Sequence, residues 1–518
     1  MNILKSLLSL SIITLTSRIL GFIRDLMIAH IFGASIFTDA FFLAFKIPNL
    51  LRQFFSEGIF YQSFVPILID YKVKKREIDI QNLIASISGF IIFVLFIITI
   101  FGIIFSCFLI SLNAPGFFKS PEKLKLSCVL LKIMFPYVLL VSLSSLYSSI
   151  LNSWNYFSIP AISSILLNAS IIIFSFFFHS YFHPSVIILA WSVIIGGFFQ
   201  LFYQFPHLYK INMLVIPKIN FRNTDLLKFL KKIGPSFLGV IANQVSLVCN
   251  TIFSSLLISG SISWMYYADR LIEFPIGMLG TSLGTILFTY LSKSRSKGIK
   301  LEQKRLLIWG FRLSLILSIP SSVVLFILAK PLIIVLFKYG KFTDFDVLMI
   351  AKALKLYSFG LVSFILVKIL ISIFYAYQEI NIPMRISIII SLLTQLINPF
   401  LIFYFQHAGL ALSFSISGWI SFFLLYRKLS QKNIFFFKFN DFIFFCRLLF
   451  ATFIMIISIN IMLYFVPAWD IGSIFDKIKR LFSILFISGA VYLISLYSMG
   501  IYLLDYSNIS SVHNNTKR

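Results

Sequence analysis

The chain has 518 residues, of which 59% are hydrophobic and only 12% are charged, and its mean hydropathy is +0.96. Soluble domains carry about 25% charged residues, so this composition excludes a soluble globular protein. The 62 phenylalanines equally exclude a disordered chain. Lysine plus arginine number 44 and aspartate plus glutamate 18, which gives a formal net charge of +26. These properties predict an all-α protein that crosses a membrane many times.

Apolar runs of about 20 residues predict membrane-spanning helices, because backbone amides in hydrocarbon must be satisfied within the helix itself. About fourteen such runs follow one another along the chain. They are residues 4–30, 38–66, 83–111, 127–151, 160–180, 185–206, 226–258, 262–292, 306–329, 346–376, 383–405, 408–428, 443–465 and 480–504. The second and eighth runs are weak in hydropathy because they contain several charges. Arg18 interrupts the first run and no small-residue cleavage site follows, so we expect a retained span rather than a signal peptide.

The basic residues in the predicted connections indicate an orientation. If the N-terminus is cytoplasmic, the cytoplasmic connections hold about twice as many lysines and arginines as the opposite ones. This bias predicts a multi-pass membrane protein with both termini cytoplasmic. Because the charges are dispersed among spans, the net charge indicates topology and contact with anionic lipid, and we expect no nucleic-acid partner.

Cysteine and histidine spacing offers no metal site or disulfide framework. The four cysteines are scattered without a C-x-x-C spacing, so we expect small residues packed among apolar helices. They are Cys107, Cys128, Cys249 and Cys446. His179 and His183 are four residues apart but have no acidic third ligand. These spacings give no reason to expect a bound metal or a cofactor. No G-x-x-x-x-G-K loop is present, so we do not expect ATP-driven pumping.

A faint internal repeat indicates two halves. Gly33 precedes Lys46-Ile47-Pro48 by the same spacing at which Gly260 precedes Glu273-Phe274-Pro275. The two stretches begin spans two and eight, which predicts parallel halves of six spans each, although chance remains an alternative in so apolar a chain. The expected organisation is a six-helix lobe over 1–206, a second over 226–428, two additional helices over 443–504 and a cytoplasmic tail over 505–518.

Charged residues cluster in the first, second and eighth spans, where each costs several kcal/mol unless it lines water or is paired. They are Arg18, Arg24, Asp25, Asp39, Lys46, Arg52, Glu57, Asp269, Arg270 and Glu273. On the second span, Asp39, Lys46, Asn49, Gln53 and Glu57 form one polar stripe at helical spacing. Arginine suits bidentate phosphate contacts, so the cluster predicts a polar cavity for an anionic substrate. The alternative is internal ion pairing that only holds helices together, and full pairing is arithmetically possible.

Several long motifs resemble one known family. They are SRILGFIRD (17–25), FGASIFTDAFF (32–42), KIPNLLRQFFSEG (46–58), LNSWNYFSIPA (151–161), SWMYYADRLIEFP (263–275), LFKYGKF (336–342) and HAGLALS (407–413). Over nearly the whole chain, the sequence resembles the MurJ (formerly MviN) lipid II flippase family of the multidrug/oligosaccharidyl-lipid/polysaccharide (MOP) exporter superfamily.

The resemblance implies six plus six plus two helices around a central cavity, and export of undecaprenyl-diphosphate-linked muropeptide (lipid II) for peptidoglycan synthesis, without enzymatic chemistry. It implies substrate-binding positions at Arg18, Arg24, Asp39, Arg52 and Arg270. It implies supporting cavity positions at Asp25, Lys46, Asn49, Gln53, Glu57, Asp269 and Glu273. Relatives often have Ser or Arg where this chain has Gln53, and the sodium site of some relatives finds no acidic cluster here. In the family the last two spans line a groove for the polyprenyl tail, and cell-wall synthesis proteins are potential partners.

Other functions remain open on the residues alone. Within transporters, the alternatives are a drug/cation antiporter or another polysaccharide-lipid exporter, although intramembrane arginines disfavour cationic substrates. A membrane-embedded transferase acting on the same lipid would need a general base, and no histidine lies in the charged cluster. A purely structural scaffold would tolerate removal of the charges.

Overall fold

The computed structural model describes residues 3–53, 64, 68, 71–72, 76–154, 156, 158–218, 244–296, 298, 300–432 and 439–501, with the side chains of 3–12, 53, 296, 300 and 439–441 left out. This part of the chain contains helices and no strand, which confirms the all-α prediction. It divides into two compact units. The first unit is Met1–Ser263 with Tyr339–Phe342, and the second is Trp264–Lys338 with Thr343–Arg518.

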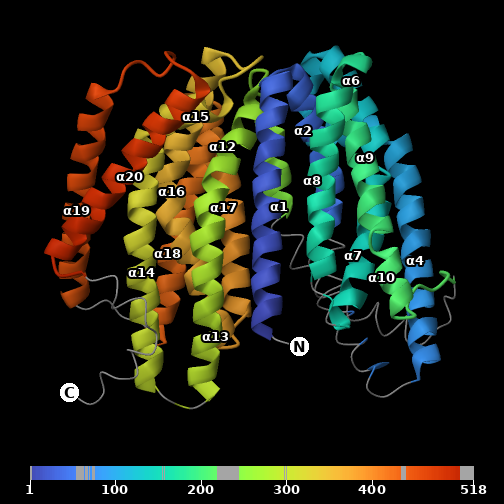
Figure 1. Ribbon diagram of the computed structural model, residues 1–518, viewed down its shortest axis with the longest axis horizontal. Coiled ribbons are helices and arrows are strands. Elements are labelled where there is room, and N and C mark those ends of the chain that lie inside the picture. The colour runs from blue at the N-terminus through green and yellow to red at the C-terminus, as the bar shows by residue number, and fades with distance from the viewer. Residues whose placement is uncertain are drawn as a thin grey trace. The chain divides into compact units, whose positions relative to one another are not determined.

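The helices of the first unit lie side by side, each packed along one or more neighbours. Their bounds are α1 (Ile3–Phe32), α2 (Ile36–Gln53), α4 (Glu77–Ile104), α5 (Ser106–Asn113), η2 (Pro115–Lys119), α6 (Pro121–Met134), α7 (Tyr137–Ser153), α8 (Ser158–Phe178), η3 (His179–Tyr181), α9 (Ile187–Phe202) and α10 (Phe205–Lys210). Within this unit α1 packs along α8, α8 along α9, and α2 along α6 (Figure 1). Helix α6, which packs on the polar second helix, begins at Pro121, whereas the predicted span begins at residue 127, so its first residues were predicted as a connection.

The second unit is built around one long helix. Its helices are α12 (Ser261–Pro275, whose first turn belongs to the first unit), η4 (Ile276–Thr281), α13 (Ser282–Ser296), α14 (Lys300–Ile327), α15 (Ala329–Phe337), α16 (Asp344–Ala376), α17 (Asn381–Phe405), α18 (His407–Gln431), α19 (Phe439–Phe465) and α20 (Ile474–Ser498). The central helix α16 packs against α18, α14, α13 and α15, and α19 pairs with α20 (Figure 1). Thr343 caps the start of α16 through the amide of Asp346, as expected for a helix start.

Eleven described helices are long and apolar enough to cross a membrane, including the charged eighth run over Ser261–Arg295. Helix α2 is not among the eleven, in keeping with the three charges that it contains, Asp39, Lys46 and Arg52. Residues 244–255 of the seventh run are helical, and the rest of that run up to residue 243 lies outside the described residues. The prediction of a multi-pass helical protein is confirmed, whereas the number fourteen stays a prediction.

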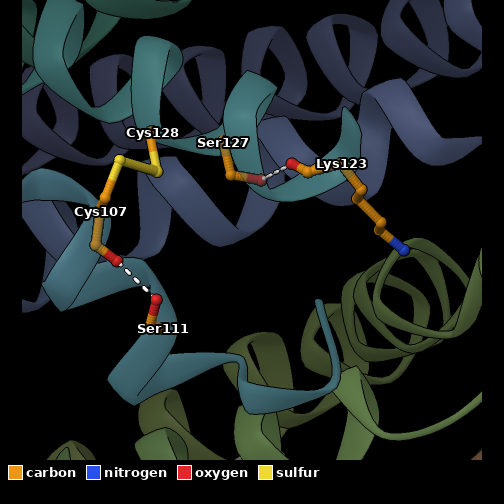
Figure 2. Close-up of a disulfide and its surroundings, with 5 residues drawn as sticks. All are labelled: Cys107, Ser111, Lys123, Ser127 and Cys128. Carbon is orange, nitrogen blue, oxygen red and sulfur yellow. Dashed lines mark hydrogen bonds between the residues drawn. A yellow bond between two sulfur atoms is a disulfide. The ribbon is translucent and has the colours of Figure 1, made fainter. Parts of the chain in front are cut away.

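The expectation that all cysteines are simply packed in apolar helices is wrong. Cys107 on α5 and Cys128 on α6 form a disulfide, with Cα atoms 4.9 Å apart and a sequence separation of 21 (Figure 2). No spacing motif in the sequence predicts this disulfide, because the two cysteines are brought together only when the chain turns back between α5 and α6. Cys249 and Cys446 are free.

The two repeated glycines share a conformation. Gly33 precedes α2 with φ +68°, and Gly260 precedes α12 with φ +99°. Pro48 and Pro275 then lie inside those helices. The similarity between the two stretches thus extends from sequence to local backbone.

A four-residue strap, Tyr339–Phe342, belongs to the first unit although it joins two helices of the second. The Lys341 amide donates to the His30 carbonyl oxygen at 3.2 Å. A Cβ at Gly340 would lie 2.2 Å from that oxygen, and one at Gly33 would lie 2.7 Å from the Lys341 oxygen. Both positions have positive φ, so glycine is required twice over where the strap meets the end of α1.

Candidate functional site

Asp39 accepts hydrogen bonds at both of its carboxylate oxygens. It lies in the first turn of α2 and is 1% exposed to solvent. One carboxylate oxygen accepts from Lys123 Nζ and the Gly260 amide, each at 2.7 Å. The other accepts from the Ser263 amide at 2.9 Å and the Ser263 hydroxyl at 2.7 Å. Asp39 therefore caps the N-terminus of α12 from a neighbouring helix, where exposed amides and the helix dipole favour a negative charge.

Arg24 and Asp25 form a buried pair on α1. Arg24 is 6% exposed, and its Nε and a terminal nitrogen donate to one Asp25 oxygen at 3.0 and 2.7 Å. Its other terminal nitrogen donates to the Asn168 side chain on α8 at 3.1 Å. Asn168 in turn donates to the Ser17 carbonyl. In this conformation the Arg24 guanidinium holds α1 to α8.

The remaining predicted residues of the first unit are more accessible. Arg18 on α1 is exposed, and Arg52 at the end of α2 is partly exposed. Arg52 donates to the Asn49 side chain at 2.8 Å, one turn earlier on the same helix. Lys46 donates to the Leu247 carbonyl at 3.1 Å and to the Thr251 hydroxyl, so it fastens α2 to the helical segment 244–255.

In the second unit, α12 presents its own charged group. The Arg270 side chain is 36% exposed and donates to Glu273 at 3.2 Å, one turn away. It also lies over the ring of Tyr266, 5.4 Å from the ring centroid. Asp269 hydrogen bonds with Tyr357 of α16. The Arg270 side chain is thus partly exposed, whereas Asp269 contacts the central helix of its unit.

The structure therefore separates the predicted set into two kinds. Arg24, Asp25 and Asp39 are buried and bound to other protein groups, whereas Arg18, Arg52 and Arg270 retain accessible surface. The side chain of Gln53 and the whole of Glu57 lie outside the described residues. The prediction that these positions bind substrate is not tested by these contacts.

Sequence reasoning missed several polar partners. Lys123 is 5% exposed and pairs with Asp39, yet it was counted among the basic residues of a connection. Asn168 and Tyr357 lie within predicted apolar spans, and their polar groups were the only available indication. Trp264, within one of the family-like motifs, donates to the buried Asp346 at 2.7 Å.

An ion-paired group also lies where the α15–α16 connection meets the segment before α20. Lys338 bonds Asp344 at 2.5 Å and also pairs with Asp470. These carboxylates raise the pKa of Lys338, chiefly through its hydrogen bond to Asp344, and Lys338 lowers the pKa of Asp470. The group fastens the loop before α20 to the rest of the second unit.

A pocket of about 430 Å³ lies between α14, α16 and α19 in the second unit. Its lining is mainly apolar and includes Phe326, Phe359 and Ile456, together with Asn460. Lys355 of α16 lies over the Phe326 ring, 5.8 Å from the centroid. Helix α19 therefore forms one wall of this apolar pocket, and the ammonium of Lys355 lies beside the pocket.

Comparison with known proteins identifies the family. The family model described as "Lipid II flippase MurJ" matches residues 28–479. A protein of Buchnera aphidicola subsp. Schizaphis graminum, described as "Probable lipid II flippase MurJ", is 68% identical over 98% of this chain and 99% of its own length.

Solved structures agree with this match. The structure entitled "Lipid II flippase MurJ, inward closed conformation" has a TM-score of 0.76 and 25% identity, covering 94% of this chain and 99% of that one. An inward-facing multidrug resistance MATE transporter of the MOP superfamily shares the fold, with a TM-score of 0.64 and 11% identity over 80% of this chain and 95% of its own. The chain belongs to the lipid II flippase MurJ family.

Proposed function

We propose that this protein moves lipid II from the inner to the outer leaflet of the bacterial inner membrane by alternating access. The family match over residues 28–479 is the observation that carries this proposal. The charges support it independently, because the unaided transfer of a diphosphate through hydrocarbon has a prohibitive desolvation cost. The protein then acts as a transporter and catalyses no covalent change.

The accessible arginines are the proposed diphosphate ligands. Arg18 of the first unit is exposed, and Arg52 of the same unit and Arg270 of the second are partly exposed. Arginine matches phosphate oxygens in a bidentate manner. Arg24 and Asp39 join this set only when their present contacts open. Lys46, Asn49, Gln53, Glu57, Asp25, Asp269 and Glu273 balance charge or contact the sugar and peptide.

The polyprenyl tail is the proposed occupant of apolar surface formed with the last two helices. The slot of about 430 Å³ between α14, α16 and α19 lies in the range of small-molecule pockets. Its wall residues Phe326 and Phe359 are half-exposed, so apolar surface is available to a chain entering from the bilayer. The tail thus stays in a lipid-like environment while the diphosphate crosses on the arginines.

Cytoplasmic termini are part of the proposal. Disulfides form in oxidising compartments such as the periplasm, so the crosslinked end of α5 and α6 is best placed there. Helices α1, α2 and α4 connect the N-terminus to that end as three successive crossings. The N-terminus is then cytoplasmic, in agreement with the basic bias of the connections.

A reconstituted assay tests the function. Purified full-length protein in lipid vesicles is expected to expose fluorescent lipid II on the outer face faster than protein-free vesicles do, with no change in the covalent structure of the lipid. An organic-cation dye serves as the second substrate. Dye transport without lipid II movement would favour an antiporter, and a covalently altered lipid would favour a transferase.

A further inference from the structure

The ion pair between Lys123 and Asp39 is buried on both sides. Lys123 is 5% exposed and Asp39 is 1% exposed, and their charged atoms are 2.7 Å apart. Asp39 also accepts from the Gly260 and Ser263 amides at the start of α12. A buried carboxylate without a counter-ion is strongly disfavoured. The positive charge of Lys123 therefore stabilises the ionised form of Asp39, which accepts the hydrogen bonds from the start of α12.

Lys123 is itself positioned by the segment that precedes it. Its ammonium lies over the Phe117 ring, 4.4 Å from the centroid, and Phe117 belongs to η2. The neighbouring Gly116 donates its amide to the Ser255 hydroxyl at 3.3 Å. A Cβ at Gly116 would lie 1.9 Å from the Ser255 carbonyl oxygen, so backbone meets backbone at this point. The segment η2 therefore touches both the lysine and the chain leading into α12.

The disulfide encloses this arrangement. Cys107 and Cys128 lie at the two ends of a loop that contains η2 and the first part of α6 (Figure 2). Ser127, beside Cys128, donates to the Lys123 carbonyl oxygen at 2.8 Å. Figure 2 shows the Lys123 side chain projecting away from the crosslink, on the helix that carries Cys128. The crosslink joins α5 to α6 close to Lys123 and so reduces the conformational freedom of this loop.

We propose that Lys123 is a positioning residue for transport and that the Cys107–Cys128 disulfide holds it against Asp39. In forming the crosslink, the two thiols lose two protons and two electrons to an external protein disulfide by thiol–disulfide exchange, and that disulfide becomes a dithiol. In the reduced chain η2 is free to leave Ser255, and Asp39 holds the start of α12 less firmly. The effect on transport rests on the proposed function, whereas the effect on α12 does not.

Hydrogen exchange of the full-length protein tests the positioning role without any substrate. Lys123→Met is expected to raise exchange in peptides covering 255–263 about tenfold, and Lys123→Arg is expected to restore protection. Lys125→Met is the matched control, because Lys125 is exposed on the same helix. Unchanged protection of 255–263 in Lys123→Met would overturn the role of the lysine.

A double-mutant cycle in the lipid II vesicle assay separates positioning from general packing. Asp39→Asn leaves the Lys123 ammonium buried without its carboxylate, so adding Lys123→Met is expected to recover part of the lost rate. Simple addition of the two losses would contradict coupling through Asp39. If wild-type protein moves no lipid II, the proposed function fails, while the exchange experiment still decides the inference.

Thiol counting and reduction test the crosslink. Of the four cysteines, two are expected to react with an alkylating reagent after denaturation without reductant, and all four after reduction. Reduction and Cys107→Ser are both expected to raise exchange in 115–123 and 255–263, whereas Cys446→Ser has no effect. Four reactive thiols without reductant, or unchanged exchange on reduction, would overturn the role of the disulfide.

Discussion

At the scale of single residues, the charged residues of the predicted site fall into two groups, one buried and hydrogen-bonded within the protein and one at least partly exposed. Arg24 and Asp39 satisfy their hydrogen bonds inside the protein, which lowers the cost of burial. Arg18, Arg52 and Arg270 are at least partly exposed, which a purely structural pairing would not require. The second group therefore carries the diphosphate contacts that we propose.

Arg270 gives the clearest test of this distinction. Arg270→Ala is expected to weaken lipid II binding by at least about tenfold, because a charge-assisted bidentate contact is lost. Arg270→Lys keeps the charge but loses the planar fork, so an intermediate affinity is expected. Binding is measured by titrating detergent-solubilised protein with labelled lipid II.

The control for Arg270 is Arg385→Ala, which removes an exposed arginine from α17 of the same unit. Its affinity is expected to equal that of the wild type. Equal loss in both variants would indicate a general effect of positive charge and would contradict a specific contact at Arg270.

Sequence reasoning identified the polar residues but not their partners. Asp39 stood out as a charge within a span, but its counter-ion lies 84 positions later on a helix predicted only from residue 127. The lysine there resembled any basic residue of a connection. Pairing over such distances depends on how helices pack, which a helical periodicity does not contain.

At the scale of elements, the strap Tyr339–Phe342 shows how little backbone is needed for a specific contact. Its Lys341 amide bonds the end of α1, and Gly340 lies where a Cβ would strike the His30 carbonyl oxygen. The strap falls within LFKYGKF, one of the motifs that resembled the family. We expect its glycine to be required for steric reasons as well as for its positive φ.

Gly340→Ala is therefore expected to destabilise the protein more than the strain of a positive φ alone, which is about 1–2 kcal/mol. Gly298→Ala is the matched control, since Gly298 has φ +71° but nothing within 4 Å of an added Cβ. Thermal unfolding in detergent is expected to show a clearly larger decrease in Tm for Gly340→Ala. Equal decreases would contradict the close contact between the strap and α1.

The helices themselves were largely predictable. The run predicted at 346–376 is observed as Asp344–Ala376, and the run at 383–405 as Asn381–Phe405, because long apolar stretches in lipid have no alternative to helix. Helices that are interrupted within one apolar run were harder to predict. The run at 83–111 is divided at Phe105 into α4 and α5, and the Cys107–Cys128 disulfide joins the second piece to α6.

At the scale of the whole molecule, composition and motifs predicted a multi-pass helical protein of this family, and the helices and the family match confirm it. The internal glycine–proline repeat has a structural counterpart at Gly33 and Gly260. The two compact units divide at Ser263 and Trp264, inside α12, while the predicted lobes over 1–206 and 226–428 stay a prediction. A boundary inside a helix leaves no mark in hydropathy, which explains why the sequence does not reveal it.

The most direct measurement is leaflet-resolved accessibility of lipid II in a flippase-depleted bacterium that expresses this chain. We predict that the wild-type protein restores lipid II to the outer leaflet, whereas the Arg18→Ala/Arg52→Ala/Arg270→Ala variant, inserted at the same level, leaves it in the inner leaflet. Restoration by the triple variant equal to that by the wild type would contradict transport of a diphosphate lipid on these arginines.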